Sequence, residues 1–242
     1  MSELDNPVWW SLHGPQRALG EIAGRAGRFD PEMSPFGAFE EPATPSDWDD
    51  MASLVGPGGT VALVDNGDRV LDRPHGWTVT WESPGVQMVA ERNPVDPPFP
   101  SRSGGPGDPV VALGAEDVAD MLALVAEAQP GPFLSRTIEF GGYVGIRRKG
   151  QLLAMAGERL RPAGWAEVSA VATHPGQRRQ GLAERLIRTV ASAIADRGET
   201  PFLHVAAGNT NAIRLYESLG FTVRGTAVRF TVVRAPPVAE PG

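Results

Sequence analysis

The chain has 242 residues, of which 41% are hydrophobic and 21% charged, a composition typical of a globular protein with one large domain or two small ones. Its net charge of −7, with no basic run beyond Arg147-Arg148-Lys149, argues against a nucleic-acid surface as the main interaction. No apolar stretch reaches the roughly 20 residues of a membrane span, and the lack of cysteine excludes disulfides, thiolate zinc sites and a cysteine nucleophile.

The first 90 residues predict an α/β unit of irregular pattern. The start, MSELDNPVWW, has neither the basic nor the apolar region of a signal peptide, so we expect a cytoplasmic, metal-independent protein. We expect a helix, in one or two pieces, from Trp9 to Gly24, a strand at PFGAFE and a helix at SDWDDMASLVG with Ser46 as N-cap. GTVALVDN reads as a strand, and WTVTWESPGVQMVAE as two strands joined by a Ser-Pro-Gly turn. Most tryptophans lie here, and core packing is favoured over an aromatic-lined pocket.

Residues 91–109, ERNPVDPPFPSRSGGPGDP, are dense in proline and glycine and have no apolar period. We interpret them as a linker. A phosphate-binding loop is disfavoured, because no strand precedes the glycines and proline removes an N–H group that such a loop needs. Residues 1–90 are therefore expected to form an accessory or degenerate unit before the linker.

Regular patterns follow the linker and predict a second domain at residues 110–234, with residues 235–242 as a flexible tail. The expected fold is α+β, a mixed and mostly antiparallel sheet flanked by helices, with one strand–helix–strand crossover from Trp165 to Val205. The Asp117–Ala128 helix would bury Val118, Met121, Leu122 and Val125 on one face. The predicted elements are strand Val110–Leu113, helix Asp117–Ala128, a hairpin of Tyr143–Arg147 and Leu152–Leu160 turning at Lys149-Gly150, strand Trp165–Thr173, a helix from about Arg179, strand Phe202–Val205, helix Thr210–Leu219 and strand Arg229–Val233.

Two arginines stand at the start of the helix in ATHPGQRRQGLAERLI, where a helix already carries partial positive charge. Two more positive charges at this position are unfavourable by themselves. A bound anion would make the arrangement favourable, because free N–H groups and two guanidinium groups would converge on it. Gly181, placed in the first helical turn at a cost of about 1 kcal/mol against alanine, would let a phosphate approach the backbone. The alternative is an exposed basic helix start that pairs with Glu184. The strand–turn–helix context favours a diphosphate site.

Two segments together resemble the signature motifs of the GNAT superfamily of acyl-CoA N-acyltransferases. In EVSAVATHPGQRRQGLAERLI, the pattern Gln/Arg-x-x-Gly-x-Gly/Ala is matched by Arg178, Gly181 and Ala183. In PFLHVAAGNTNAIRLYESLGF, a second family pattern is matched by Asn209, Ala212, Tyr216, Gly220 and Phe221. The strand LLAMAGERL also resembles the branch of the glycine N-acyltransferases. The resemblance covers about residues 110 to 233.

The resemblance implies a site for acetyl-CoA as co-substrate and no metal. The diphosphate would lie on the turn and helix start, and the pantetheine arm would pair with the preceding strand like an added strand. Asn209 would cap the later helix and meet the pantetheine or order its loop. The residues implied for acetyl-CoA binding are Val171, Ala172, Thr173, Arg178, Arg179, Gln180, Gly181, Leu182, Ala183, Asn209, Ala212 and Tyr216.

The resemblance also implies direct attack of an amine on the thioester, with Tyr216 as general acid. Glu167 is the candidate general base, with apolar neighbours that would raise its pKa. A water chain, Glu158, Glu139 and Ser169 remain alternatives for the base. His174 and His204 are assigned to the turn and the core.

The function expected from these residues is an N-acetyltransferase that moves an acetyl or short acyl group to a primary amine of a small molecule or amino acid. The alternative is a non-catalytic acyl-CoA sensor or interaction module. We expect the first half to wall the acceptor site through its Trp77–Val89 hairpin. The sequence gives no signal for the oligomeric state or for the acceptor.

Overall fold

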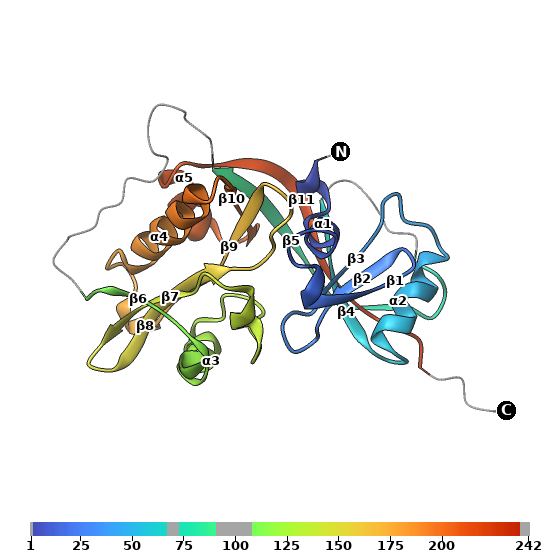
Figure 1. The fold of residues 1–242 in the computed structure, drawn as a ribbon, viewed down its shortest axis with the longest axis horizontal. Helices are drawn as coiled ribbons and strands as arrows, with labels where there is room; N and C mark the ends of the chain where they lie inside the picture. The colour runs from blue at the N-terminus through green and yellow to red at the C-terminus, as the bar shows by residue number, and fades with distance from the viewer. Residues whose placement is uncertain (1, 67–72, 91–107, 238–242) are drawn as a thin grey trace.

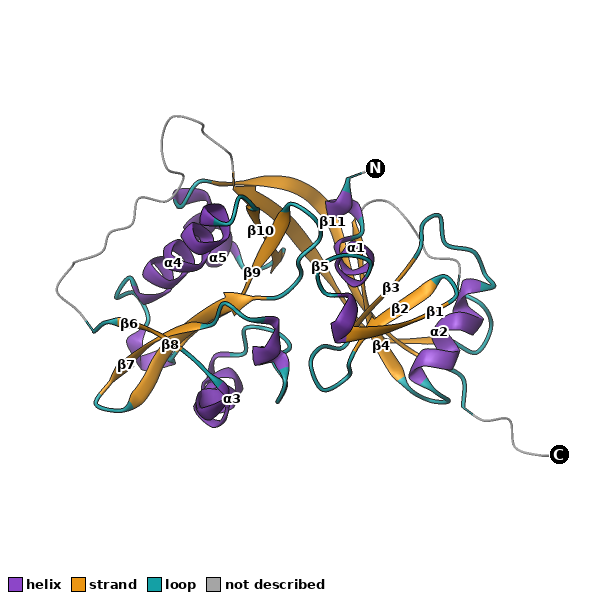
Figure 2. Cartoon of the chain, viewed as in Figure 1, coloured by secondary structure: helices purple, strands orange, loops and turns teal. Residues whose placement is uncertain are grey.

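A computed structural model describes residues 2–66, 73–90 and 108–237 of the chain. Its strands form an 11-stranded sheet in the order β1-β2-β3-β4-β11-β5-β10-β9-β8-β7-β6 (Figures 1 and 2). The helices are α1 (Pro7–Leu12), α2 (Asp47–Val55), α3 (Val118–Ala128), α4 (Leu182–Asp196) and α5 (Thr210–Ser218). The strands are β1 (Gly20–Ala23), β2 (Ala26–Phe29), β3 (Phe36–Phe39), β4 (Thr60–Asn66), β5 (Thr78–Ala90), β6 (Val110–Ala112), β7 (Val144–Arg148), β8 (Gln151–Glu158), β9 (Trp165–Thr173), β10 (Thr200–Ala206) and β11 (Phe221–Arg234).

The sheet is mixed and mostly antiparallel, which confirms the predicted fold class. Only the pairs β3–β4 and β9–β10 run parallel within the described strands. The β7–β8 hairpin turns at Lys149 and Gly150, which both have positive φ, the conformation that a two-residue hairpin turn requires. The crossover from β9 through α4 to β10 is the predicted strand–helix–strand unit.

The predicted hairpin around Ser83-Pro84-Gly85 is wrong, because β5 runs through these residues as one strand. Its first half pairs only with β11, and from Gly85 onward it pairs with β10 as well. Proline is tolerated at position 84 because β5 is an edge of the sheet up to that point, so one row of N–H groups is not needed for pairing. Gly85 is required for a different reason: a Cβ there would collide with the Phe230 ring.

The predicted helix from Trp9 to Gly24 is wrong beyond Leu12. Asn6 caps α1 by accepting a hydrogen bond from the Trp9 N–H (3.3 Å), and the helix ends before Gly14-Pro15. The chain then forms the β1–β2 hairpin. Ser46 stands at the predicted N-cap of α2, but its side chain does not cap the helix. In the turn before α2, Asp47 accepts the Thr44 N–H (2.8 Å).

Helices cover both faces of the sheet where it carries β7, β8 and β9. α4 lies on one face of these strands and α3 on the other, while α5 packs against β11 (Figure 2). The apolar row predicted for α4 is buried throughout, at Leu182, Leu186, Ile187, Val190 and Ile194. The buried residues of α3 are Met121 and Leu124, whereas Leu122 is exposed. The predicted face of α3 is confirmed at Met121 and Val125 and wrong at Leu122, because Leu124 takes that place against the core.

The two halves of the chain share one sheet. The long strands β5 and β11 pair along most of their length and join the N-terminal part to the part that carries α3, α4 and α5 (Figure 1). The predicted boundary at residue 90 thus follows a strand that lies between β10 and β11, and the division into two domains stays a prediction. The predicted linker lies outside the described residues, apart from Asp108 and Pro109.

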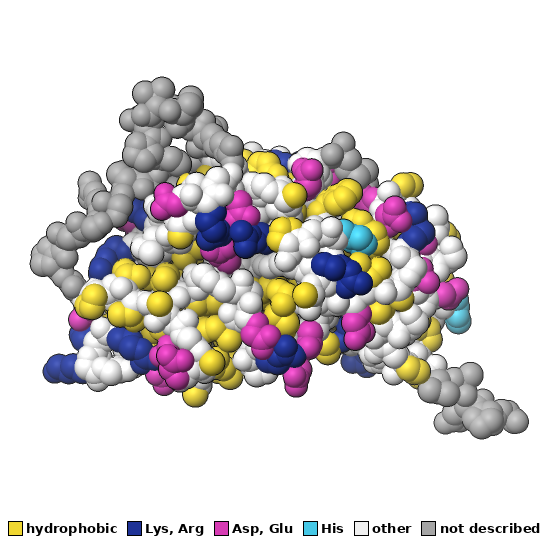
Figure 3. All heavy atoms as spheres, in the orientation of Figure 1, with side chains coloured by type: hydrophobic (Ala, Val, Ile, Leu, Met, Phe, Trp, Pro, Cys, Tyr) yellow, Lys and Arg dark blue, Asp and Glu magenta, His cyan; other side chains and the backbone are white. Residues whose placement is uncertain are grey.

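None of the helices in residues 2–66, 73–90 and 108–237 is long and apolar enough to cross a bilayer. On the face seen in Figure 3, acidic and basic side chains lie intermixed.

Candidate active site

The sheet opens between β9 and β10. These strands pair in parallel only from Trp165 to Glu167 of β9. Beyond that point β10 continues along β5, while β9 continues along β8. Residues 168–173 of β9 therefore have no strand partner on the β10 side among the described residues, and the backbone N–H and C=O groups that face this side are free to pair with a ligand.

A bulge in β9 enlarges this opening. Ala170 and Val171 together stand opposite the single residue Ala156 of β8, and Ala170 has a φ of 51°. Such a bulge bends the strand and interrupts its ladder, and a positive φ is uncommon for a residue with a Cβ. Strain of this kind is typical of sites where the backbone itself meets a ligand.

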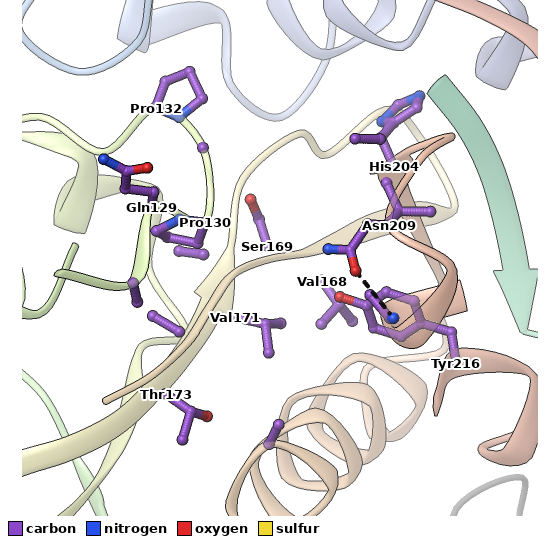
Figure 4. Close-up of a pocket in the computed structure, with 18 of the residues that line it drawn as sticks. Gln129, Pro130, Pro132, Val168, Ser169, Val171, Thr173, His204, Asn209 and Tyr216 are labelled. Atoms are coloured by element: carbon purple, nitrogen blue, oxygen red, sulfur yellow. Dashed lines mark hydrogen bonds between the residues drawn. The ribbon is translucent and has the colours of Figure 1, made fainter. Parts of the chain in front are cut away.

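The opening leads into a cleft of about 1020 Å³. In Figure 4, Asn209, Tyr216 and His204 lie on one side of β9, and Gln129, Pro130 and Pro132 lie on the other. All residues predicted to bind the co-substrate line the cleft except Gln180, whose side-chain amide donates to Gln177 Oε1 (3.0 Å). The predicted residues on its wall are Val171, Ala172, Thr173, Arg178, Arg179, Gly181, Leu182, Ala183, Asn209, Ala212 and Tyr216.

The start of α4 differs from the prediction in one respect that matters for its chemistry. The helix begins at Leu182 and not at Arg179, so both arginines lie in the preceding turn. Gly181 is the N-cap, with a φ of 75°, a conformation that glycine adopts without the penalty of other residues. No side chain caps the helix, and a Cβ at Gly181 would meet nothing within 4 Å. No side chain therefore accepts from the first N–H groups of α4, which leaves them available to a ligand.

Among the described residues, no carboxylate pairs with the two arginines at this helix start. Arg178 and Arg179 are exposed and make no hydrogen bond or ion pair with any described residue. Glu184, the predicted alternative partner, pairs with Arg188 (3.1 Å). Two unpaired guanidinium groups and the positive end of a helix dipole form an anion site.

Asn209 and Tyr216 form the α5 side of the cleft. Asn209 Oδ1 accepts the Ala212 N–H (3.2 Å), which confirms the predicted cap. Tyr216 is buried, and this burial, together with the charge of Glu167, raises the pKa of its phenol to about 12. The phenol is therefore fully protonated at neutral pH and can donate a hydrogen bond into the cleft.

Glu167 is fully buried and does not reach the cleft wall. Burial alone would raise its pKa, but the charge of Arg159 and hydrogen bonds from Arg159 and His204 lower the pKa well below its ordinary range. The carboxylate accepts from Arg159 Nη2 (2.7 Å) and Nε (2.9 Å) and from His204 Nδ1 (2.8 Å). The predicted rise in its pKa is thus wrong. Arg159, which directly follows the neighbouring strand β8, lowers the pKa more than the apolar surroundings raise it.

His204 and Arg159 are members of the site that sequence reasoning undervalued or missed. Both line the cleft, and both bind Glu167. His204 Nε2 lies 3.1 Å from the side-chain nitrogen of Gln87, so His204 carries its proton on Nδ1 and accepts at Nε2. Phe202 of β10 pairs with Glu167, and His204 lies two residues farther along the same strand, so it points to the same face of the sheet as Phe202. This alternation along the strand was the sequence signal that could have placed His204 beside Glu167.

The other candidate bases are placed as follows. Glu158 pairs with Arg197 (2.6 Å), and Glu139 binds Arg136 (2.6 Å). Neither lines the cleft, whereas Ser169 does. His174 caps the turn before α4 by accepting the Gly176 N–H (3.1 Å), in agreement with its predicted role. Among the residues that the structure describes, no three His, Asp or Glu side chains are grouped to hold a metal ion.

The N-terminal part closes the cleft opposite α4. Pro35 and Phe36 at the start of β3, Ala62 of β4, and Trp81 and Ser83 of β5 line this side. Trp9, Trp48 and Trp77 are buried in the core, and Trp81 alone among the described tryptophans lines the cleft.

Comparisons with known proteins give a consistent result. Residues 143–230 match the family model of FR47-like proteins. A protein from Novosphingobium aromaticivorans, assigned to the GNAT family of acetyltransferases, is 43% identical over 97% of this chain and 99% of its own, with a TM-score of 0.84. A GCN5-related N-acetyltransferase from Kribbella flavida is 20% identical over 90% of this chain and 89% of its own (TM-score 0.58). A Drosophila protein is 15% identical over 88% of this chain and 74% of its own (TM-score 0.62). No curated protein matches the chain.

Proposed function

This chain belongs to the GNAT family, and from that premise we propose that it transfers an acetyl or short acyl group from acyl-CoA to a primary amine of a small molecule or amino acid. The observation that carries the proposal is the pair of unpaired arginines at the uncapped start of α4, beside the free edge of β9. The predicted glycine N-acyltransferase branch and the cytoplasmic location stay predictions.

The proposed acyl-CoA site uses both features together. The diphosphate would accept hydrogen bonds from the first N–H groups of α4 and from Arg178 and Arg179. The pantetheine amides would pair with the free backbone of residues 168–173, in the manner of an added strand. Gln180 points its amide at Gln177, so we assign it no contact with the diphosphate.

The proposed reaction is direct transfer. The amine nitrogen attacks the thioester carbon, the C–N bond forms, and the tetrahedral intermediate expels the thiol as the C–S bond breaks. Tyr216 would donate its proton to the departing sulfur. Because its pKa of about 12 lies above the value of about 8.5 typical of a thiol, this proton transfer must accompany C–S cleavage. The amine loses its proton in the same reaction.

Glu167 is the base candidate inherited from the sequence, and its contacts favour an indirect role. A carboxylate that already accepts from Arg159 and His204, with a lowered pKa, has a low affinity for a further proton. We therefore assign Glu167 as a positioning residue that fixes the His204 tautomer and holds Arg159 at the cleft. Removal of the amine proton is then left to water in the cleft.

Two measurements on the intact protein test this proposal. Titration calorimetry with CoA should show binding, and release of free thiol from acetyl-CoA should depend on added amine. Arg178→Ala should weaken CoA binding, whereas Arg214→Ala should not, because Arg214 is an exposed arginine on α5 outside the cleft wall. Binding without turnover for every amine would favour the alternative function, an acyl-CoA sensor. An absence of CoA binding would refute both.

A further inference from the structure

The cleft carries very little charge where the N-terminal part forms its wall. The side chains there and on the neighbouring strand β11 are mostly apolar, and they include Phe36, Ala62, Trp81, Phe230 and Val232. The charged residues on the described wall are Arg159, Arg178, Arg179 and Glu184. Arg178, Arg179 and Glu184 belong to the turn and start of α4, so Arg159 is the charged group at the opposite end.

Arg159 forms hydrogen bonds with only one edge of its guanidinium group. Its Nε and Nη2 atoms donate to Glu167, and its side chain is 12% exposed. Its Cζ atom lies 4.7 Å from the centre of the Phe36 ring, which also lines the cleft. Nη1, on the other edge, has no hydrogen-bond partner among the described residues. Because Glu167 lies behind the wall, the free Nη1 corner is the part of the guanidinium that a ligand can meet.

Arg159 is also close to the proposed reaction centre. Glu167 Oε1 accepts both Arg159 Nη2 (2.7 Å) and His204 Nδ1 (2.8 Å), so one carboxylate oxygen separates the guanidinium from the imidazole. His204 and Tyr216 line the same cleft (Figure 4). Because Arg159, His204 and Tyr216 line one cleft, an anionic group bound to Arg159 would share that cleft with the acceptor amine.

We propose that Arg159 binds the carboxylate of the acceptor and that the acceptor is a free α-amino acid with an apolar side chain. This inference rests on the proposed acyl transfer and specifies its substrate class. In an α-amino acid the amine and the carboxylate are attached to the same carbon, so a carboxylate bound by Arg159 would keep the amine in the cleft that Tyr216 also lines. The apolar side chain would pack against Phe36, Trp81 and Phe230.

The same wall disfavours polycationic acceptors. A polyamine or an aminoglycoside carries additional ammonium groups that need carboxylates on the wall. Among the described lining residues the only carboxylate is Glu184, which lies at α4 and pairs with Arg188. The N-terminus of a peptide has no carboxylate beside its amine, so it would leave Arg159 Nη1 unpaired.

The test compares matched acceptors with the intact protein and acetyl-CoA. L-Phenylalanine and L-leucine should be acetylated with a kcat/KM about 10- to 100-fold higher than their carboxamides, the range expected for a hydrogen bond between two charged groups. The amine of the carboxamide is less basic than that of the amino acid, so a larger fraction of it is uncharged and reactive at neutral pH. This difference alone would favour the carboxamide, so a higher kcat/KM for the amino acid cannot result from amine basicity. Spermidine should be a poor acceptor.

Variants separate the two parts of the proposed site. Arg159→Lys keeps a charge beside Glu167 but loses the free Nη1 donor, so it should raise KM for phenylalanine about tenfold or more and raise KM for the carboxamide clearly less. Trp81→Ala should raise KM for apolar amino acids. Val79→Ala is its control, because Val79 is an exposed residue on the same strand that does not line the cleft.

The outcomes distinguish this inference from the proposed function. Carboxamides or spermidine used as well as the amino acids would overturn the inference and leave acyl transfer intact. An Arg159→Lys variant that loses amino acid and carboxamide equally would also overturn it. CoA binding with no turnover of any acceptor in the panel would overturn the inference, and a lack of CoA binding would refute the function itself.

Discussion

Glu167→Gln removes the charge of a carboxylate that the structure holds between Arg159 and His204. Both partners of the Arg159–Glu167 pair are shielded, with side-chain exposures of 12% and 0%, and two short hydrogen bonds join them. The neutral amide can replace one acceptor but leaves the guanidinium charge buried without a counter-charge. Breaking such a buried pair costs about 3–5 kcal/mol. We expect a loss of this size in the free energy of unfolding.

The assay is urea denaturation followed by fluorescence of the six tryptophans. The matched control is Glu139→Gln, which changes a glutamate that also makes two hydrogen bonds to one arginine, Arg136, but at the surface. The control should unfold close to the wild type, because exposed pairs contribute little. A Glu167→Gln variant as stable as Glu139→Gln would refute the reasoning.

The same pair predicts a pH dependence with a definite sign. The pKa of Glu167 is lowered in the folded state, so its stabilising contribution is fully present above the ordinary glutamate pKa of about 4.3. The contribution decreases as the pH falls below that value. The difference in stability between wild type and Glu167→Gln should therefore shrink on acidification from neutral pH, and a difference that grows would contradict this assignment.

The remaining predictions concern the cleft. Tyr216→Phe should lower kcat about 100-fold or more, while the CoA dissociation constant stays near the wild-type value; equal effects on both would remove Tyr216 from the proton transfer. Arg178→Ala should raise the CoA dissociation constant about 10- to 100-fold, as measured by calorimetry, whereas Arg214→Ala should leave it at the wild-type value. A wild-type dissociation constant in both variants would count against the anion site. Gly181→Ala should cost about 1–2 kcal/mol by urea denaturation because of its positive φ. Gly208→Ala should be nearly neutral, since Gly208 has open space and no positive φ; similar losses in both would show that backbone conformation is not the cause.

The sequence predicted well those parts of the site that depend on local pattern. β9 has its predicted bounds, the apolar row of α4 is buried, and Asn209 caps α5. These features depend on residues that are close in the chain, such as the alternation of a strand, the spacing of a helix and a capping side chain. The family motifs contain the same local spacings.

The features that were missed depend on contacts between distant segments. Ser83-Pro84-Gly85 is typical of a turn, yet β11 pairs with β5 before, along and after these residues and keeps the strand extended. The pKa of Glu167 is lowered by Arg159, which arrives from the far end of β8, and its sequence neighbours give no sign of this. Gly181 precedes α4 in a left-handed conformation, so the helix begins later than the apolar spacing indicated.

The central claim is that the diphosphate of an acyl-CoA binds at the start of α4, and a crystal structure of the complex with CoA tests it most directly. The account predicts phosphate oxygens within hydrogen-bonding distance of the Leu182 and Ala183 N–H groups and of the Arg178 guanidinium. Phosphate density elsewhere on the molecule, with this helix start still facing solvent, would contradict it.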